Sequence, residues 1–173
     1  SYNDSKLGSN NTNFALLVSQ EFDDPFNDPN EYAYEISKLA NKLSDGSVIV
    51  QKYGDIKKGR RSTPKRIAEG FVKPTLKEAV PGDLGLVLPY NFMKSLIEMI
   101  EALNHVSPGI ASDHTLFYGV EAKFYSDCPV VSNDFETSIH NLYVGGDGAG
   151  ITRGLAQAGA NGVKIARIII SKK

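Results

Sequence analysis

The 173-residue chain has no tryptophan, one cysteine and no long apolar run. The single cysteine, Cys128, excludes a disulfide within the chain and fits a reducing compartment. No segment approaches the ~20 consecutive apolar residues of a membrane-spanning helix, and nothing resembles a signal peptide. We therefore expect a cytoplasmic protein with no membrane partner.

An excess of charge of either sign is also missing. The chain has 19 Lys and Arg against 20 Asp and Glu, for a formal net charge of −1. A nearly neutral chain has no global attraction for nucleic acid, so we expect no nucleic-acid partner. Its length suits one domain, or one domain plus part of a second.

One segment, 54–66, is locally basic and carries Lys57, Lys58, Arg60, Arg61, Lys65 and Arg66. Such a cluster can contact phosphate, but its composition favours a solvated loop. The nearby aromatic residue, Tyr53, does not by itself make a stacking platform for bases.

Apolar periodicity predicts an α+β fold, a mixed sheet with packed helices. Apolar residues that recur every three or four positions predict helices at about 31–43, 89–105 and 151–170. Short apolar runs predict strands at 14–18, 47–53, 115–124, 130–132 and 142–144. Asn30 and Asn91 are candidate helix caps, and Asp45-Gly46 is expected to end the first helix.

A glycine-rich turn, Gly145-Gly146-Asp147-Gly148-Ala149-Gly150, joins the last predicted strand to the last predicted helix. A strand, a glycine turn and a helix together place backbone N–H groups beside an anionic ligand. Asp147 would repel a phosphate, so its carboxylate is better suited to accept hydrogen bonds from hydroxyls, such as those of a ribose or ribityl chain.

The spacing of these glycines excludes two common nucleotide motifs. G-x-G-x-x-G would need a third glycine where the chain has Ile151 or Arg153, and no Lys-Ser/Thr pair follows the glycines as in a P-loop. A tight strand-to-helix connection with no ligand remains one interpretation.

A longer pattern favours a ligand. Thr137, followed by Leu142-Tyr143-Val144-Gly145 and Gly146-Asp147, resembles the second FAD-binding motif of glutathione-reductase-like flavoproteins. Gly119-Val120-Glu121-Ala122-Lys123 and Cys128-Pro129-Val130-Val131 are similar to Gly-Val-Glu-Thr-Arg and Ser-Pro-Val-Arg-Ile stretches of bacterial FAD-dependent dehydrogenases. A lysine stands at position 123 where the family has arginine, and lysine cannot form the planar bidentate fork.

The resemblance implies a FAD-dependent oxidoreductase in which Asp147 binds the ribityl chain. The expected FAD contacts are Gly146, Asp147, Gly148, Ala149, Gly150 and Ile151. The family carries G-x-G-x-x-G upstream, and this chain does not contain it. The expected partners are therefore the missing N-terminal half of the same polypeptide and a small-molecule substrate, and the chain alone is expected to be inactive.

The same resemblance implies a domain organisation. We expect a substrate or insert domain at 14–135, and the last strand, turn and helix of an FAD-binding domain at 136–173. The basic segment would then be a loop near the active-site entrance. The polar composition of residues 1–13, which is rich in Asn, Ser and Gly, separately predicts a mobile segment there.

Other candidate chemistry is less specific. The three histidines do not have metal-ligand spacing, so no metal site is expected, and Cys128 is best interpreted as structural or incidental. Asp113-His114 is a possible acid–base pair, and Glu121 and Lys123 share a strand face. No catalytic acid or base can be named.

Two further interpretations stay open. One is a non-enzymatic α+β module that binds a ligand or partner at the same helix N-terminus, and the other is a phosphoanion-binding enzyme without flavin.

Overall fold

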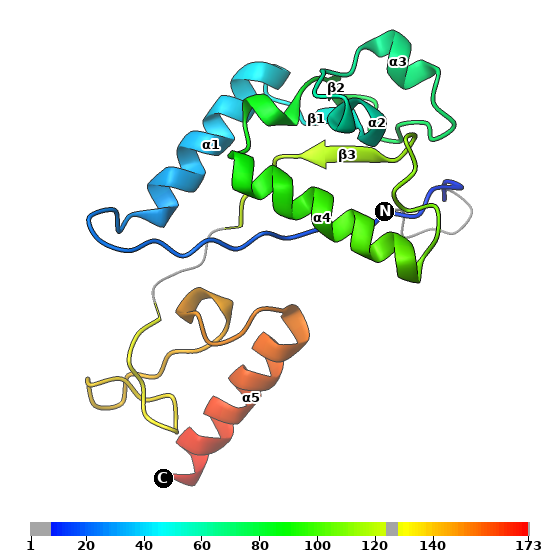
Figure 1. Cartoon of the computed structure of the whole chain (residues 1–173). Coiled ribbons are helices and arrows are strands. Elements are labelled where there is room, and N and C mark those ends of the chain that lie inside the picture. The colour runs from blue at the N-terminus through cyan, green and yellow to red at the C-terminus, as the bar shows by residue number, and fades with distance from the viewer. Residues whose placement is uncertain (1–7, 124–127, 173) are drawn as a thin grey trace. The chain divides into compact units, whose positions relative to one another are not determined.

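The computed structural model describes residues 8–123 and 128–172. The chain divides into two compact units, Ser1–Ala122 and Lys123–Lys173 (Figure 1). Our sequence-based boundary lay later, between residues 135 and 136. Most of the expected mobile segment, and the last residue of the strand expected at 115–124, lie outside the described residues; residues 8–13 are exposed and form neither helix nor strand.

The first unit contains a three-stranded sheet of order β2-β1-β3. Its strands are β1 (Ile49–Lys52), β2 (Val80–Pro81) and β3 (Leu116–Gly119). β1 pairs parallel with β2 and antiparallel with β3. The sheet is therefore mixed, and the predicted α+β class is confirmed.

Two long helices, α1 (Pro29–Ser44) and α4 (Tyr90–Val106), accompany this sheet (Figure 1). Asp28 rather than Asn30 caps α1, because its side chain accepts a hydrogen bond from the Glu31 N–H while proline takes the first helical position. Asp45 adopts a left-handed conformation and ends the helix, as predicted.

The second prediction of a cap was wrong. Asn91 lies inside α4, which begins directly after Pro89 and has no side-chain cap. The extended backbone at that proline defines the helix start instead.

The core of the first unit forms two clusters around β1. One joins Ala40 of α1 to Ile49, Leu84 and Val87, and the other joins Tyr53, Ile56 and Ile100. Partly buried Met93 and Phe117 pack against both clusters. α4 therefore contributes to the core through its apolar face, as its periodicity predicted.

The segment 54–66 is not simply a loop. The helix α2 (Tyr53–Lys57) follows β1 directly, and α3 (Pro64–Ala68) begins after a Thr63 cap. A short 3-10 helix, η1 (Leu84–Leu86), follows β2. Each of these elements is too short to show the apolar repeat by which the long helices were predicted.

Three predicted strands were wrong. Residues 14–18 and 130–132 contain no strand, and 142–144 keep only an isolated bridge between Glu136 and Tyr143. Phe14 and Leu17 remain 49% and 65% exposed. Apolar runs of this length suit a strand, but a strand also needs a paired neighbour for its backbone groups.

The second unit consists of that bridge, a 3-10 turn η2 (Asp147–Ala149) and the helix α5 (Leu155–Ser171). α5 begins later than the predicted residue 151 because residues 150–154 form the turn that leads into it. Its apolar side chains are largely outside any core; Leu155 is 94% and Ile170 72% exposed.

We predict that Ile100→Ala destabilises the first unit by about 2–5 kcal/mol, because Ile100 is buried and truncation leaves a cavity. Its neighbour on α4, Met99, is half exposed, so Met99→Ala should cost less than about 1 kcal/mol. Urea unfolding followed by circular dichroism measures both variants. Equal losses would contradict the assignment of α4 to the core.

Candidate functional site

The glycine-rich turn contains two backbone conformations that favour glycine. Gly146 has φ 76° and Gly150 has φ 66°, and they flank η2 on either side. Residues with a β-carbon rarely adopt these angles. The conformation of the turn therefore accounts for glycine at these two positions without any ligand.

Gly145 is required for a different reason, which is close packing against α5. A β-carbon there would overlap Asn161 Oδ1 and would lie 2.6 Å from Ile165 Cδ1. The adjacent Gly146 N–H donates to the same Oδ1 at 2.8 Å, and Asn161 is buried. Asn161 thus fixes the turn onto the second turn of α5.

Asp147 lies where the turn meets the start of α5. Its Oδ1 accepts a hydrogen bond from the Thr152 hydroxyl at 2.5 Å and from the Gly154 N–H at 3.1 Å. Gly154 is the residue that precedes the first turn of α5. The carboxylate therefore faces the helix N-terminus, is exposed, and already accepts a hydroxyl hydrogen.

The backbone N–H groups of the turn are used internally. Those of Ala149, Ile151 and Thr152 donate to the Gly146 carbonyl at 3.2–3.4 Å, and that of Gly150 donates to the Asp147 carbonyl at 3.0 Å. Ala149 is buried, whereas Gly148 is exposed. The six predicted contact residues thus form one turn, but it offers a carboxylate rather than a cradle of N–H donors.

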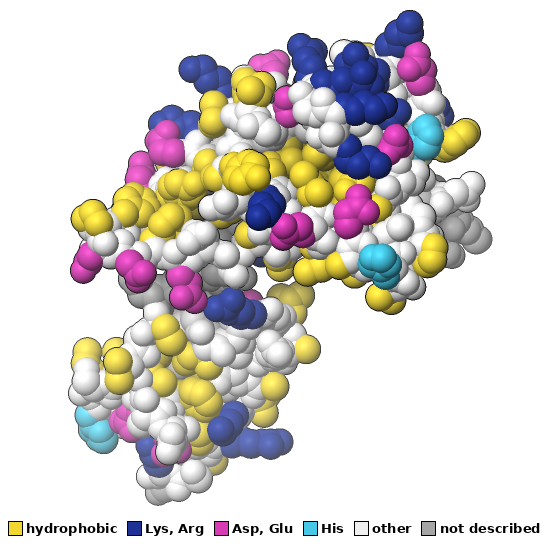
Figure 2. Space-filling model, viewed as in Figure 1, with side chains coloured by type: hydrophobic (Ala, Val, Ile, Leu, Met, Phe, Trp, Pro, Cys, Tyr) yellow, Lys and Arg dark blue, Asp and Glu magenta, His cyan; other side chains and the backbone are white. Residues whose placement is uncertain are grey.

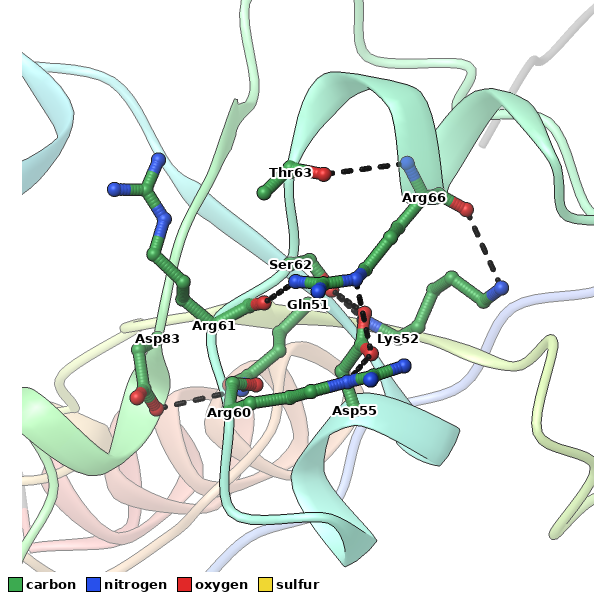
Figure 3. A network of polar contacts seen from close by, with 9 residues as sticks. All are labelled: Gln51, Lys52, Asp55, Arg60, Arg61, Ser62, Thr63, Arg66 and Asp83. Carbon is green, nitrogen blue, oxygen red and sulfur yellow. Dashed lines mark hydrogen bonds and ion pairs between the residues drawn. The ribbon is translucent and has the colours of Figure 1, made fainter.

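A second polar cluster surrounds Asp55 on α2, a residue that the sequence interpretation did not single out. Asp55 is buried; its Oδ1 accepts from Arg60 Nε at 2.7 Å, and its Oδ2 accepts from the Ser62 hydroxyl at 2.7 Å. Arg66 Nε lies 4.0 Å from the same Oδ1. Figure 3 shows the guanidinium groups of Arg60 and Arg66 beside this carboxylate, while the Arg61 side chain points away from it.

Asp55 is held in its ionised form. Burial opposes ionisation, but the hydrogen bonds from Ser62 and Arg60, with the charges of Arg60 and Arg66, outweigh it and lower the pKa of the carboxyl. The sequence contained a signal for this cluster: Asp55 is the one carboxylate among seven Lys and Arg between positions 52 and 66.

A third polar cluster, in the second unit, is formed by Glu136, Tyr143 and Lys172. Glu136 accepts hydrogen bonds from the Asn141 N–H at 2.7 Å and from Lys172 Nζ at 2.9 Å. Lys172, which follows α5, also contacts the Tyr143 hydroxyl at 3.2 Å. The hydrogen bond from Asn141 and the Lys172 ammonium lower the pKa of Glu136 to about 2. This cluster ties the end of α5 to the Glu136–Tyr143 bridge.

The other candidates are not brought together. Asp113 pairs with Lys57 at 2.6 Å, whereas His114 Nδ1 accepts from the Phe71 N–H at 3.4 Å. Cys128 is exposed. The residues that the structure describes contain no ion pair between Glu121 and Lys123, and no cluster of three metal-ligating side chains.

The chain matches no family model, and no curated protein matches it. Over residues 8–123 and 128–172, no helix has the length and apolar character needed to cross a membrane.

We predict that Gly145→Ala loosens the turn, because its β-carbon would overlap Asn161 and Ile165. Hydrogen exchange of the α5 amides should become faster by at least about tenfold, as expected for a local loss of about 1.4 kcal/mol. Gly148→Ala is the matched control, since a β-carbon there meets nothing within 4 Å. Equal exchange in both variants would contradict the close packing of Gly145 against α5.

We also predict that the second unit loses stability as the pH falls from about 4.5 towards about 2. The pKa of Glu136 is depressed in the folded chain, so its contribution is full above its ordinary value of 4.5 and is lost through the folded pKa of about 2. NMR titration of the carboxyl measures this pKa directly. In Lys172→Met it should move up towards 4.5; an unchanged value would contradict the role given to the ammonium.

Proposed function

We propose that this chain is the C-terminal part of a FAD-dependent oxidoreductase, with the Gly146–Ile151 turn lying against the ribityl chain of FAD. The Asp147 carboxylate carries the proposal, because it lies at the start of α5 and accepts a hydrogen bond from the Thr152 hydroxyl. A sugar-alcohol hydroxyl presents the same donor. FAD would supply the redox chemistry when bound, and the protein would bind and orient it.

Gly148 adds support that is independent of Asp147. It is exposed, its φ is not in the left-handed region, and an added β-carbon would meet nothing within 4 Å. Neither backbone conformation nor packing within the unit calls for glycine there. A ligand that approaches the backbone closely would account for it.

The exposed surface of α5 supports a larger assembly. Gly159 and Gly162 have open space around them, although glycine within a helix costs about 1 kcal/mol relative to alanine. Leu155, Val163 and Ile170 are more than half exposed. A helix with small and apolar side chains on its exposed faces suits burial against a further layer of protein or a cofactor. The proposed N-terminal half of the polypeptide would provide that layer.

The non-flavin alternatives fit the turn less well. A phosphoanion-binding enzyme, or a module with an anion site at the helix N-terminus, would use backbone N–H groups of the turn or of the start of α5. Four N–H groups of the turn donate to its own carbonyls. At the start of α5 the Gly154 N–H donates to the Asp147 carboxylate, which would repel an anion. A neutral polyol arm suits this arrangement better.

The proposal predicts that the polypeptide produced from the complete coding region is yellow, with absorbance near ~450 nm from bound FAD. Asp147→Ala should reduce FAD retention by about tenfold, a loss of about 1.4 kcal/mol that is typical of a hydrogen bond to a charged group. Gly148→Ala should also weaken retention while leaving this chain's own stability unchanged.

Asp134→Ala is the matched control, since Asp134 is a half-exposed carboxylate in the same unit that pairs with Lys172 at 3.4 Å. Its loss should leave FAD retention unchanged. A colourless polypeptide that takes up no added FAD would refute the proposed function. Equal retention in Asp147→Ala and Asp134→Ala would refute the ribityl contact.

A further inference from the structure

The cationic side chains of the first unit are concentrated around one carboxylate. Seven of the chain's 19 Lys and Arg lie between Lys52 and Arg66, where Asp55 is the one acidic residue. Figure 2 shows these dark-blue side chains gathered over α2 and α3. Lys57 pairs with a different carboxylate, that of Asp113. Arg60 and Arg66 are the two cations that share the single negative charge of Asp55.

Asp55 contacts the Nε side of two guanidinium groups. Arg60 and Arg66 both approach Asp55 Oδ1 through Nε, at 2.7 Å and 4.0 Å. The outer nitrogens remain for other acceptors: both Nη atoms of Arg60, and Nη2 of Arg66, donate no hydrogen bond to residues 8–123 and 128–172. Arg66 Nη1 donates to the Arg61 carbonyl at 3.0 Å, which fixes that group further.

The two guanidinium groups are accessible as well as fixed. The Arg60 and Arg66 side chains are 45% and 36% exposed, whereas Asp55 is 3% exposed. The carboxylate is itself held by the buried Ser62 hydroxyl. A buried acceptor that orients two exposed, charged donors lowers the entropy lost when an anion binds them.

We propose that Arg60 and Arg66 form a binding site for a phosphate group of a small molecule. Guanidinium groups bind phosphate oxygens through pairs of parallel hydrogen bonds, and the two groups converge on one carboxylate (Figure 3). This site lies in the first unit, and its existence does not depend on FAD binding by the second.

The local surroundings favour a small ligand over a nucleic acid. Proteins that bind single strands combine cations with exposed aromatic rings on which bases stack. Tyr53, the aromatic residue of the segment 52–66, is fully buried. The basic segment therefore offers charge and hydrogen-bond donors but no ring of its own for stacking.

The test is calorimetric titration of the chain with inorganic pyrophosphate at about 150 mM salt, where long-range attraction is screened beyond about 8 Å. Arg60→Gln and Arg66→Gln should each weaken binding by at least about tenfold. Arg61→Gln is the matched control, because it removes the same charge from a neighbouring side chain that points away from Asp55. It should change the affinity by less than about twofold.

Asp55→Asn distinguishes a site in which Asp55 positions the arginines from a diffuse positive surface. Removing a negative charge should strengthen anion binding to a diffuse surface. If Asp55 positions the arginines, the same change should weaken binding severalfold, with the fold checked by circular dichroism.

Three outcomes would overturn the proposal. They are no saturable binding of pyrophosphate, equal losses in Arg60→Gln and Arg61→Gln, and tighter binding by Asp55→Asn. Binding of a DNA duplex that pyrophosphate does not displace would instead identify a nucleic-acid surface and would also overturn it.

Discussion

The first unit depends on the hydrogen bonds of one buried polar side chain, that of Gln51 on its central strand. Gln51 is 1% exposed; its Oε1 accepts from the Leu84 N–H at 2.8 Å, and its Nε2 donates to the Arg60 carbonyl at 2.9 Å. An amide buried without partners would cost several kcal/mol. These bonds join β1 to η1 and to the backbone that carries Arg60, so the strand and the Asp55 cluster form one polar network. Ser62 extends it, because its hydroxyl accepts from the Lys52 N–H while donating to Asp55.

How much the sequence alone revealed depended on whether a local pattern or a long-range contact defined each feature. The long helices α1 and α4 follow from apolar residues at helical spacing, and the stop at Asp45 follows from local turn chemistry. The strand expected at 14–18 has the right residue types, but strand formation is decided by a partner distant in sequence. Asp55 stands out in the sequence as the one carboxylate among seven Lys and Arg, but its burial, which makes it significant, is not indicated by a basic and polar segment.

The candidate turn shows the same division. Its six residues were identified together because they are contiguous, and glycine at 146 and 150 follows from their positive φ angles. The acceptor that holds the turn, Asn161, is fifteen residues away on α5. No spacing rule for nucleotide motifs includes it, so this contact became visible only in three dimensions. Whether the turn binds FAD stays a prediction. At Gly148 packing within the unit does not require glycine, whereas a ligand close to the backbone would.

The Thr152 hydroxyl that donates to Asp147 has a consequence for any polyol that reaches this carboxylate. A carboxylate has about four acceptor positions, and the Thr152 hydroxyl and the Gly154 N–H both bond to Oδ1 of Asp147. A ligand hydroxyl that displaces Thr152 keeps the number of donors on the acid, whereas a ligand with no hydroxyl at that point leaves the acid with one donor fewer. The acid therefore selects ligands that present a hydroxyl to the start of α5.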